Sequence, residues 1–457
     1  MGRYEQIIKE RERKLKELIK KQINPYAYKF NRKNFSSEIK KRYKKLKDNQ
    51  TSRNKVKIAG RIMIIRNLGK LIFATINDSK GSIQIVLQTR KTSRKDIEFF
   101  KKYIDVGDII GCYGFVMKTR TGEISVLVNK LELLAKSLLP LPEKWHGLSD
   151  KEERFRRRYL DLIMNPEIKD IFAKRSEIIK ALRDFLIKKG FLEVDTPVLQ
   201  PIAGGAIAKP FITKYNAYDM DVYMRIAPEL YLKRLLIGGF DKIFEFSRCF
   251  RNEGVDWSHN PEFTNLEFYH AYIEYNELMK LTEELIVYAV KKVNGKLEIQ
   301  RNSRKIKIKK PFKKITFEKL TKGKMSDEAF KEAIKKIKEP TFVINHPIKI
   351  SPLAKKNDER TAQRFQLIID GIEIVNAFSE LNNPLEQEKR FKEQAKKKGE
   401  KHEHDEDFVE ALKYAMPPAA GFGMGIDRFV MLITGSNSLR EVLLFPFMKP
   451  DDKIKSV

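Results

Sequence analysis

The stretch from residue 243 to residue 275 constrains the fold of this chain most, because it places charges inside a strand-forming sequence. Apolar residues alternate over 243–250 and over 263–268, and a segment rich in Asn, Gly, Asp and Ser separates them. This pattern predicts two strands joined by a polar loop. Charged side chains stand at the strand ends and within the second strand: Arg251, Glu253, His259, Glu262 and Glu267. Burying unpaired charge costs on the order of several kcal/mol, so these groups need a ligand or, in a salt-bridged hairpin, each other.

The length of the chain, 457 residues, favours two or three domains over a single core. Its two cysteines, Cys112 and Cys249, are too few for a disulfide framework or a zinc site, which predicts a reducing, cytoplasmic location. No apolar run approaches the roughly 18 residues of a membrane span. We therefore expect a soluble protein that has no membrane partner.

Basic residues dominate the charge of the chain. Lysine and arginine number 92 against 61 aspartates and glutamates, which gives a formal charge of +31. Such an excess attracts polyanions and makes their binding sensitive to salt. Nucleic acid is the obvious partner, although solvated faces of a lysine-rich protein explain the composition equally well.

Residues 1–55 are predicted to form a basic N-terminal helical arm. Apolar residues at helical spacing over 3–22 predict an amphipathic helix that ends before Asn24 and Pro25, and a second basic run covers 40–47. The arm either docks on a neighbouring domain, grips nucleic acid or is a solvated helix.

Residues 56–139 consist of short alternating segments separated by tight turns. They predict a five-stranded β-barrel of the oligonucleotide-binding (OB) type, which binds single strands by stacking bases on aromatic rings. Arg66, Phe73, Gln84 and Glu123 are candidates for one binding face. The pattern alone favours the alternative that Phe73 belongs to the barrel core.

Residues 140–162 are interpreted as a linker, because prolines bound the segment, and residues 163–457 as a further domain. A helix is predicted from Asn165-Pro166 to Gly190. The lysine-rich region 291–340 is interpreted as an insertion without chemistry, with a strand near 315–317 and a helix from about Ser326. The acidic run 402–407 predicts exposed surface rather than a metal cluster.

Several segments resemble, in order, the class II aminoacyl-tRNA synthetases in their lysyl-tRNA synthetase version. They are RIAPEL at 225–230, FRNEG at 250–254, NAFSEL at 376–381 and AAGFGMGIDR at 419–428. Pro197 matches the proline of the first class II motif, which implies a homodimer interface around it. The barrel matches the domain that recognises the uridine-rich anticodon in that family. The resemblance also implies that residues 163–457 are the class II catalytic domain, an α+β domain in which helices flank an antiparallel sheet.

The resemblance implies a role for individual residues. Arg251 and Arg428 would be catalytic, because a guanidinium can bind a carboxylate and a phosphate together. The implied ATP-binding set is Arg251, Glu253, His259, Asn260, Phe263 and Arg428. The implied lysine-binding set is Gly205, Glu229, Arg251, Glu267, Tyr269, Asn376, Phe378 and Glu380. The implied anticodon-binding set is Arg66, Phe73, Gln84 and Glu123.

Magnesium is the implied cofactor, since it bridges ATP phosphates and prefers oxygen ligands. Glu373 matches one acidic metal ligand of the family, whereas Gln366 stands where a second acid is usual. Asp370 is a candidate substitute. The presence of Gln366 in place of an acid puts the number of bound metal ions in question.

We therefore expect a lysine-tRNA ligase that joins L-lysine to ATP and transfers it to the 3′-end of tRNA(Lys). Two alternatives stay open at this point. One is an aspartyl- or asparaginyl-type enzyme, which Glu267 and Glu380 disfavour because its substrate side chain is not cationic. The other is a non-catalytic tRNA-binding or signalling paralogue.

Overall fold

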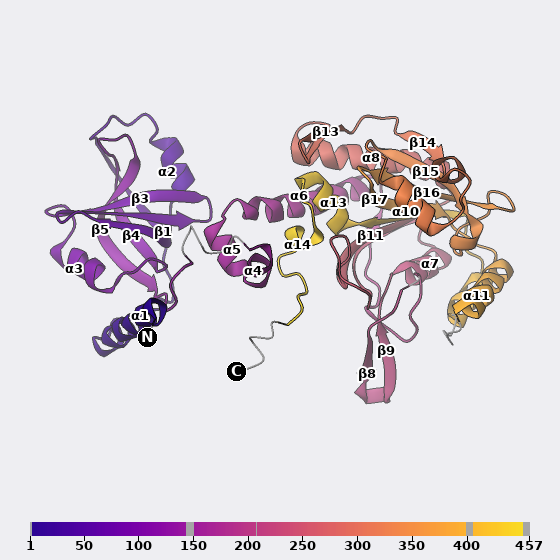
Figure 1. The fold of residues 1–457 in the computed structure, drawn as a ribbon, viewed down its shortest axis with the longest axis horizontal. Helices are drawn as coiled ribbons and strands as arrows, with labels where there is room; N and C mark the ends of the chain where they lie inside the picture. Colours follow the sequence, from indigo (N-terminus) through magenta and orange to yellow (C-terminus); the bar gives the residue numbers. More distant parts are fainter. Residues whose placement is uncertain (1, 143–149, 207, 399–404, 451–457) are drawn as a thin grey trace. The chain divides into compact units, whose positions relative to one another are not determined.

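The computed structural model describes residues 2–142, 150–206, 208–398 and 405–450. The chain is divided into two compact units, Met1–Asp150 and Lys151–Val457 (Figure 1). Part of the predicted linker, 143–149, and part of the acidic run, 402–404, lie outside the described residues. The described Asp405 caps helix α12 (Glu406–Lys413) and pairs with Arg234 at 2.8 Å.

The first unit is a closed five-stranded barrel, which confirms the predicted OB fold. The strands follow the order β1-β2-β3-β5-β4. Their bounds are β1 (Thr51–Asn67), β2 (Leu71–Asp78), β3 (Gly81–Gln88), β4 (Ile109–Lys118) and β5 (Ile124–Ala135). Between β3 and β4 lies a helix that we did not predict, α3 (Arg94–Tyr103), and its Phe100 is buried in the barrel core.

The N-terminal helices are docked on the barrel. Helix α1 (Arg3–Lys20) buries Leu18 in the barrel core, and its Arg11 donates hydrogen bonds to the carbonyls of Val106 and Leu139. Helix α2 (Ser36–Arg42) buries Ile39 in the same core. Of the three interpretations of this basic region, docking accounts for its position.

Strand β2 settles the position of Phe73. Ile72, Ala74 and Ile76 are buried in the barrel core, whereas Phe73 and Thr75 are only half-buried. Successive side chains of a strand point to opposite faces, so Phe73 points outward from the barrel. The alternative that Phe73 is a core residue is therefore wrong.

The second unit contains an eight-stranded sheet in the order β14-β15-β16-β17-β18-β11-β10-β6. The bounds are β6 (Leu192–Glu193), β10 (Lys242–Phe250), β11 (Glu262–Ala271), β14 (Lys313–Thr316), β15 (Thr341–Pro347), β16 (Thr361–Ile369), β17 (Ile372–Ser379) and β18 (Ala419–Gly425). The predicted antiparallel sheet is correct for its centre. The outermost strands at both edges, β14 and β6, pair in parallel, so the sheet as a whole is mixed.

One face of this sheet is covered by α6 (Ile168–Lys188), α8 (Tyr275–Asn294) and α13 (Ile426–Thr434) (Figure 1). Phe244, Phe268, Phe365 and Phe422 of the sheet are buried against these helices. Because side chains alternate along a strand, the residues between them point to the opposite face. That opposite face carries the polar cavity described below.

The remaining elements frame this sheet. Short helices α4 (Lys151–Arg156) and α5 (Arg158–Met164) precede α6. Strands β8 (Ile212–Tyr215) and β9 (Met220–Met224) form a projecting hairpin (Figure 1), and β7 (Leu199–Gln200) pairs with β9. The region 291–340 contains the hairpin β12 (Glu298–Arg301) and β13 (Arg304–Lys307), strand β14, and helices α9 (Phe317–Thr321) and α10 (Asp327–Ile334). Helices α7 (Glu229–Ile237), α11 (Pro384–Lys398), α12 and α14 (Leu439–Val442) complete the unit.

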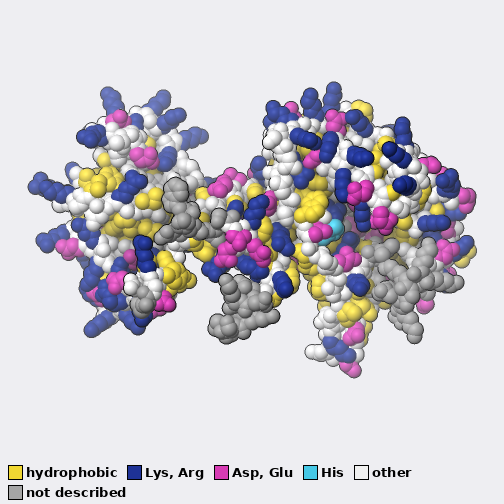
Figure 2. Space-filling view, in the orientation of Figure 1, with side chains coloured by type: hydrophobic (Ala, Val, Ile, Leu, Met, Phe, Trp, Pro, Cys, Tyr) yellow, Lys and Arg dark blue, Asp and Glu magenta, His cyan; other side chains and the backbone are white. Residues whose placement is uncertain are grey.

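Lysine and arginine side chains are spread over the visible face of each unit rather than gathered in one patch (Figure 2). Among the described helices, none is both long and apolar enough to cross a membrane.

Candidate active site

Glycines on the central strand β18 leave room for a cavity. In the strand register, Gly421 lies between Tyr269 of β11 and Phe378 of β17, and Gly423 lies between Glu267 and Asn376. Neighbours in register point to the same face of a sheet. Because glycine lacks a side chain, a hollow forms above β18 between the side chains of the two flanking strands.

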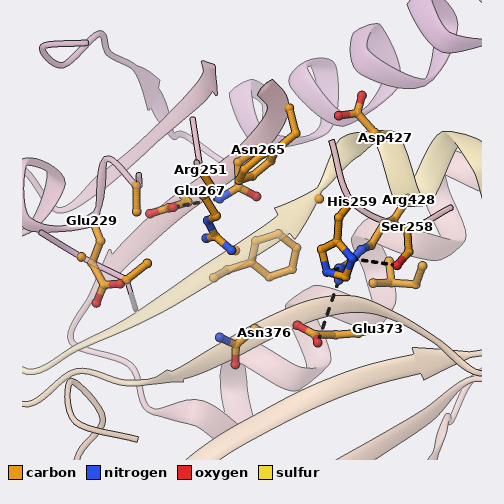
Figure 3. Close-up of a pocket in the computed structure, with 18 of the residues that line it drawn as sticks. Glu229, Arg251, Ser258, His259, Asn265, Glu267, Glu373, Asn376, Asp427 and Arg428 are labelled. Atoms are coloured by element: carbon orange, nitrogen blue, oxygen red, sulfur yellow. Dashed lines mark hydrogen bonds and ion pairs between the residues drawn. The ribbon is translucent and has the colours of Figure 1, made fainter. Parts of the chain in front are cut away.

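This hollow is a cavity of about 260 Å³ that collects most of the predicted site residues. Those that line it are Gly205, Glu229, Arg251, Glu253, His259, Asn260, Phe263, Glu267, Tyr269, Glu373, Asn376, Phe378 and Arg428. Glu229 and Glu267 lie toward one end, and His259 and Arg428 lie toward the other, with Arg251 between them (Figure 3). The cavity therefore has an acidic end and a basic end.

Glu267 is the buried carboxyl group of the acidic end. Its Oε1 accepts a hydrogen bond from Asn265 Nδ2 at 2.8 Å, and its Oε2 accepts one from the Tyr269 hydroxyl at 3.1 Å. Burial, reinforced by the charge of Glu229, raises the pKa of Glu267 to about 8. A cation entering this end of the cavity would restore the ionised form.

Glu380 follows β17 and lies beside this end of the cavity, although it is not one of the residues that line it. A methyl group on Gly421 would come within 2.0 Å of Glu380 Oε1, so this oxygen lies over the cavity floor beside Tyr269. Among the described residues, Oε1 has no hydrogen-bond donor. Burial raises the pKa of Glu380 to about 8, although the neighbouring Lys233 acts in the opposite direction.

Lys233 is a residue that sequence reasoning missed. Its Nζ lies 2.5 Å from Glu380 Oε2 and 2.6 Å from Glu229 Oε1, and its side chain is fully buried. We expected Glu229 and Glu380 to face only the substrate, and each instead shares one oxygen with this internal ammonium. The spacing of Glu229 and Lys233 on one helix signals their pairing, whereas Glu380 is distant in sequence.

Arg251 and Asn376 lie in the middle of the cavity. The Nε of Arg251 is buried, and no described residue accepts its hydrogen bond. The Asn376 Oδ1 accepts a hydrogen bond from Arg364 Nε at 2.9 Å, which turns the amide nitrogen of Asn376 away from Arg364. Both residues can therefore donate to a carboxylate, and Arg364, which we did not predict, sets the orientation of the amide.

The basic end combines an aromatic ring with cations. The Arg251 guanidinium lies 5.0 Å from the centre of the Phe263 ring. Arg428 Nη2 lies 3.3 Å from His259 Nε2, and His259 Nδ1 lies 2.9 Å from Asp256 Oδ2. A flat ring flanked by cations suits a purine nucleotide with its phosphates.

The loop and the start of α13 are joined to the sheet by polar contacts. Glu253 and Asn260 both lie in the loop between β10 and β11. Asn260 Nδ2 donates a hydrogen bond to the Glu262 carbonyl at 2.6 Å. Asp427 accepts a hydrogen bond from the Thr264 amide at 3.0 Å and pairs with Arg175 at 2.6 Å. These contacts fix α13, which begins with Ile426, so that Arg428 faces the cavity.

The predicted metal ligands are only partly brought together. Glu373 lines the cavity and lies 4.0 Å from Arg428, and Gln366 is buried on β16 opposite Asn376. Asp370 is not a substitute ligand, because it lies in the β16–β17 turn and pairs with Arg301 at 2.8 Å. The described residues include no group of three His, Cys, Asp or Glu side chains arranged for a metal ion.

Three of the four anticodon candidates, Arg66, Phe73 and Gln84, lie on the outer face of the barrel, and Glu123 lies in the turn between β4 and β5. Arg66 lies opposite Phe73 in the β1–β2 pair, and Gln84 lies opposite Thr75, two residues further along β2. Gln84 accepts a hydrogen bond from Ser125 Oγ at 2.9 Å, and Glu123 precedes that serine by two positions. Glu123 pairs with Lys40 of α2 at 3.1 Å, which we did not predict.

The geometry agrees with comparisons to known proteins. A family model described as tRNA synthetases class II (D, K and N) matches residues 150–449, and one described as an OB-fold nucleic acid binding domain matches residues 56–134. The lysine-tRNA ligase of Carboxydothermus hydrogenoformans is 47% identical, over 98% of this chain and 99% of the relative. Those of Fervidobacterium nodosum and Thermotoga maritima are 44% and 43% identical, over 94% and 96% of this chain and 92% and 95% of the relatives. Similarity of this extent means that the chain belongs to the class II lysyl-tRNA synthetases.

Proposed function

We propose that this protein is a lysine-tRNA ligase whose acidic end binds the side-chain ammonium of L-lysine and whose basic end binds ATP. The observation that carries the assignment is the pair of buried carboxyl groups, Glu267 and Glu380, beside one cavity. A buried ammonium needs carboxylates to offset its loss of hydration. The side-chain carboxylate of aspartate would be repelled by the ionised forms of the same two groups.

The remaining side chains complete the lysine site. Gly205 lies beside Ala227 and Glu229 with a φ of +84°, a conformation that glycine adopts without strain. Backbone groups of this turn and one oxygen of Glu229 bind the α-ammonium in this proposal. Phe378 forms the apolar wall along the methylene stem, and Arg251 with Asn376 binds the α-carboxylate.

The first reaction follows from this placement. A carboxylate oxygen of lysine attacks the α-phosphorus of ATP, a new P–O bond forms, and the bond to the leaving pyrophosphate breaks. Arg251 contacts both the carboxylate and the α-phosphate, and Arg428 stabilises charge on the distal phosphates. Adenine lies on Phe263, and Glu253 accepts a hydrogen bond from its amino group. No side-chain nucleophile is required, and the 3′-end of the tRNA then displaces AMP.

Magnesium fits this site best as an ion that arrives on the phosphates of ATP. Glu373 offers one carboxylate at the basic end, while Gln366 offers at most a neutral amide oxygen. Bound magnesium would neutralise the phosphate charge. Among the described residues, a complete set of acidic ligands is not present without the nucleotide.

The outer face of the barrel is the proposed anticodon site. Phe73 would stack a base, and Arg66, Gln84 and Glu123 would contact base edges. The ion pair of Glu123 with Lys40 adds a cation beside that face, which favours a phosphate nearby.

We also propose that the protein is a homodimer that works in the cytoplasm. Leu192, Leu199 and Ile212, around the predicted motif 1 region, are 51%, 53% and 61% exposed. Leu199 and Ile212 belong to strands that both pair with β9, and large apolar side chains exposed in this way are typical of a subunit interface. Sedimentation of the wild type as a dimer and of Leu199→Glu as a monomer would support the assignment, and a monomeric wild type would contradict it. Both cysteines are free and buried, which suits a reducing compartment.

Amino-acid-dependent exchange of pyrophosphate into ATP tests the proposed function. We expect exchange with lysine and not with aspartate or asparagine. Glu380→Gln should raise the KM for lysine far more than the KM for ATP, because it removes a charge at the acidic end of the cavity, away from the end that binds ATP. Exchange with aspartate alone would contradict the assignment, and no exchange with any amino acid would favour a non-catalytic paralogue.

A further inference from the structure

Lys233 is a fully buried cation placed between two carboxylates of the substrate site. It lies in α7, one helical turn after Glu229, and its Nζ is 2.6 Å from Glu229 Oε1 and 2.5 Å from Glu380 Oε2. The rings of Phe378 and Phe408 lie 5.5 and 6.0 Å from the same nitrogen. The ammonium is therefore enclosed by aromatic rings and held by the two carboxylates.

The position of Lys233 leaves part of each carboxylate free. The Oε2 atom of Glu380 pairs with Lys233. Its Oε1 atom lies over Gly421 and accepts no hydrogen bond from a described residue. Glu229 gives Oε1 to Lys233 and lines the cavity. A group that binds one oxygen of each carboxylate fixes where the other oxygen points.

The balance of charge around the bound substrate also indicates a role for Lys233. Glu229, Glu267 and Glu380 bring three carboxyl groups together, whereas lysine brings two ammonium groups and a carboxylate that Arg251 can neutralise. Lys233 supplies the third positive charge. Without Lys233, one of the three carboxylates in the complex with lysine would be buried with no cation beside it.

We propose that Lys233 is a positioning residue for lysine recognition, a fixed internal ammonium that holds one oxygen of Glu229 and one of Glu380 and so orients both carboxyl groups toward the two ammonium groups of the substrate. The inference rests on the proposed lysine-binding role of this cavity. It assigns to α7 a function in specificity as well as in packing.

Lys233→Met tests the inference, since methionine has a similar shape and no charge. In pyrophosphate exchange we expect the KM for lysine to rise at least about tenfold, the change that corresponds to one pKa unit in a carboxylate. The KM for ATP should stay close to the wild-type value. The matched control is Arg234→Met, on the same helix, which removes the pair with Asp405 and should leave the KM for lysine unchanged.

A second comparison separates positioning from folding. If Lys233 acts through Glu380, the rise in the KM for lysine in Lys233→Met/Glu380→Gln should be smaller than the product of the rises in the two single variants. The double variant also neutralises both partners, so it should fold even if Lys233→Met alone misfolds. If the effects of the two substitutions on the KM for lysine simply multiply, or if the KM rises equally for lysine and ATP, the inference is overturned and the proposed function stands. A wild type without lysine-dependent exchange would overturn the proposed function and the inference together.

Discussion

Lysine binding should release protons and strengthen as pH rises toward 8. Burial raises the pKa of both Glu267 and Glu380 to about 8, so at pH 7 each carboxyl group in the free protein is mostly protonated. An ammonium binds the ionised form, so a proton must leave when lysine enters. One pKa unit corresponds to about 1.4 kcal/mol, which makes the cost at pH 7 about 1.4 kcal/mol for each group that loses a proton.

The sign and size of this effect are specific. Because both pKa values are raised, affinity should increase about tenfold per pH unit between pH 6 and 7 if one group titrates, more steeply if both do, and should level off above about pH 8. Calorimetry in two buffers with different ionisation enthalpies measures the protons released per lysine bound. Glu380→Gln should reduce that number. An affinity independent of pH, with no proton release at pH 7, would refute the reasoning.

Three further predictions concern other parts of the molecule. Gly421→Ala should raise the KM for lysine at least about tenfold, because its methyl group would lie 2.0 Å from Glu380 Oε1; an unchanged KM would place that carboxylate elsewhere. Arg364→Met should raise the KM for lysine more than the KM for ATP in pyrophosphate exchange, because the amide of Asn376 loses the partner that orients it. Equal rises in the two KM values would argue for general destabilisation. Phe73→Ala should raise the KM for tRNA in aminoacylation by roughly 5- to 150-fold, from about 1–3 kcal/mol of base stacking, and should leave pyrophosphate exchange unchanged; a loss of exchange would contradict a role limited to tRNA.

The sequence predicted elements whose pattern is local. Alternation predicted the two strands over 243–250 and 263–268, which are β10 and β11. The capping residues at 165–166 and at 190 likewise predicted helix α6. Phe73 shows the limit of this approach, since aromatic character suggested core. Its outward position follows only once Ala74, a small residue, is counted as a core residue of β2.

Contacts between distant segments were beyond sequence reasoning. The pairing of Lys233 with Glu380 and that of Arg364 with Asn376 depend on strand register and on how α7 packs. Asp370 was a plausible metal ligand by its position near Glu373, but the β16–β17 turn directs it to Arg301. The parallel edges of the sheet likewise arise from long connections that leave no periodic signal.

The structure of the protein with L-lysine bound would test the central claim most directly. We predict that the side-chain nitrogen of lysine lies within about 3 Å of oxygens of both Glu267 and Glu380, with Lys233 still on the other oxygen of Glu380. A bound lysine whose side-chain nitrogen points away from both carboxylates would contradict the account.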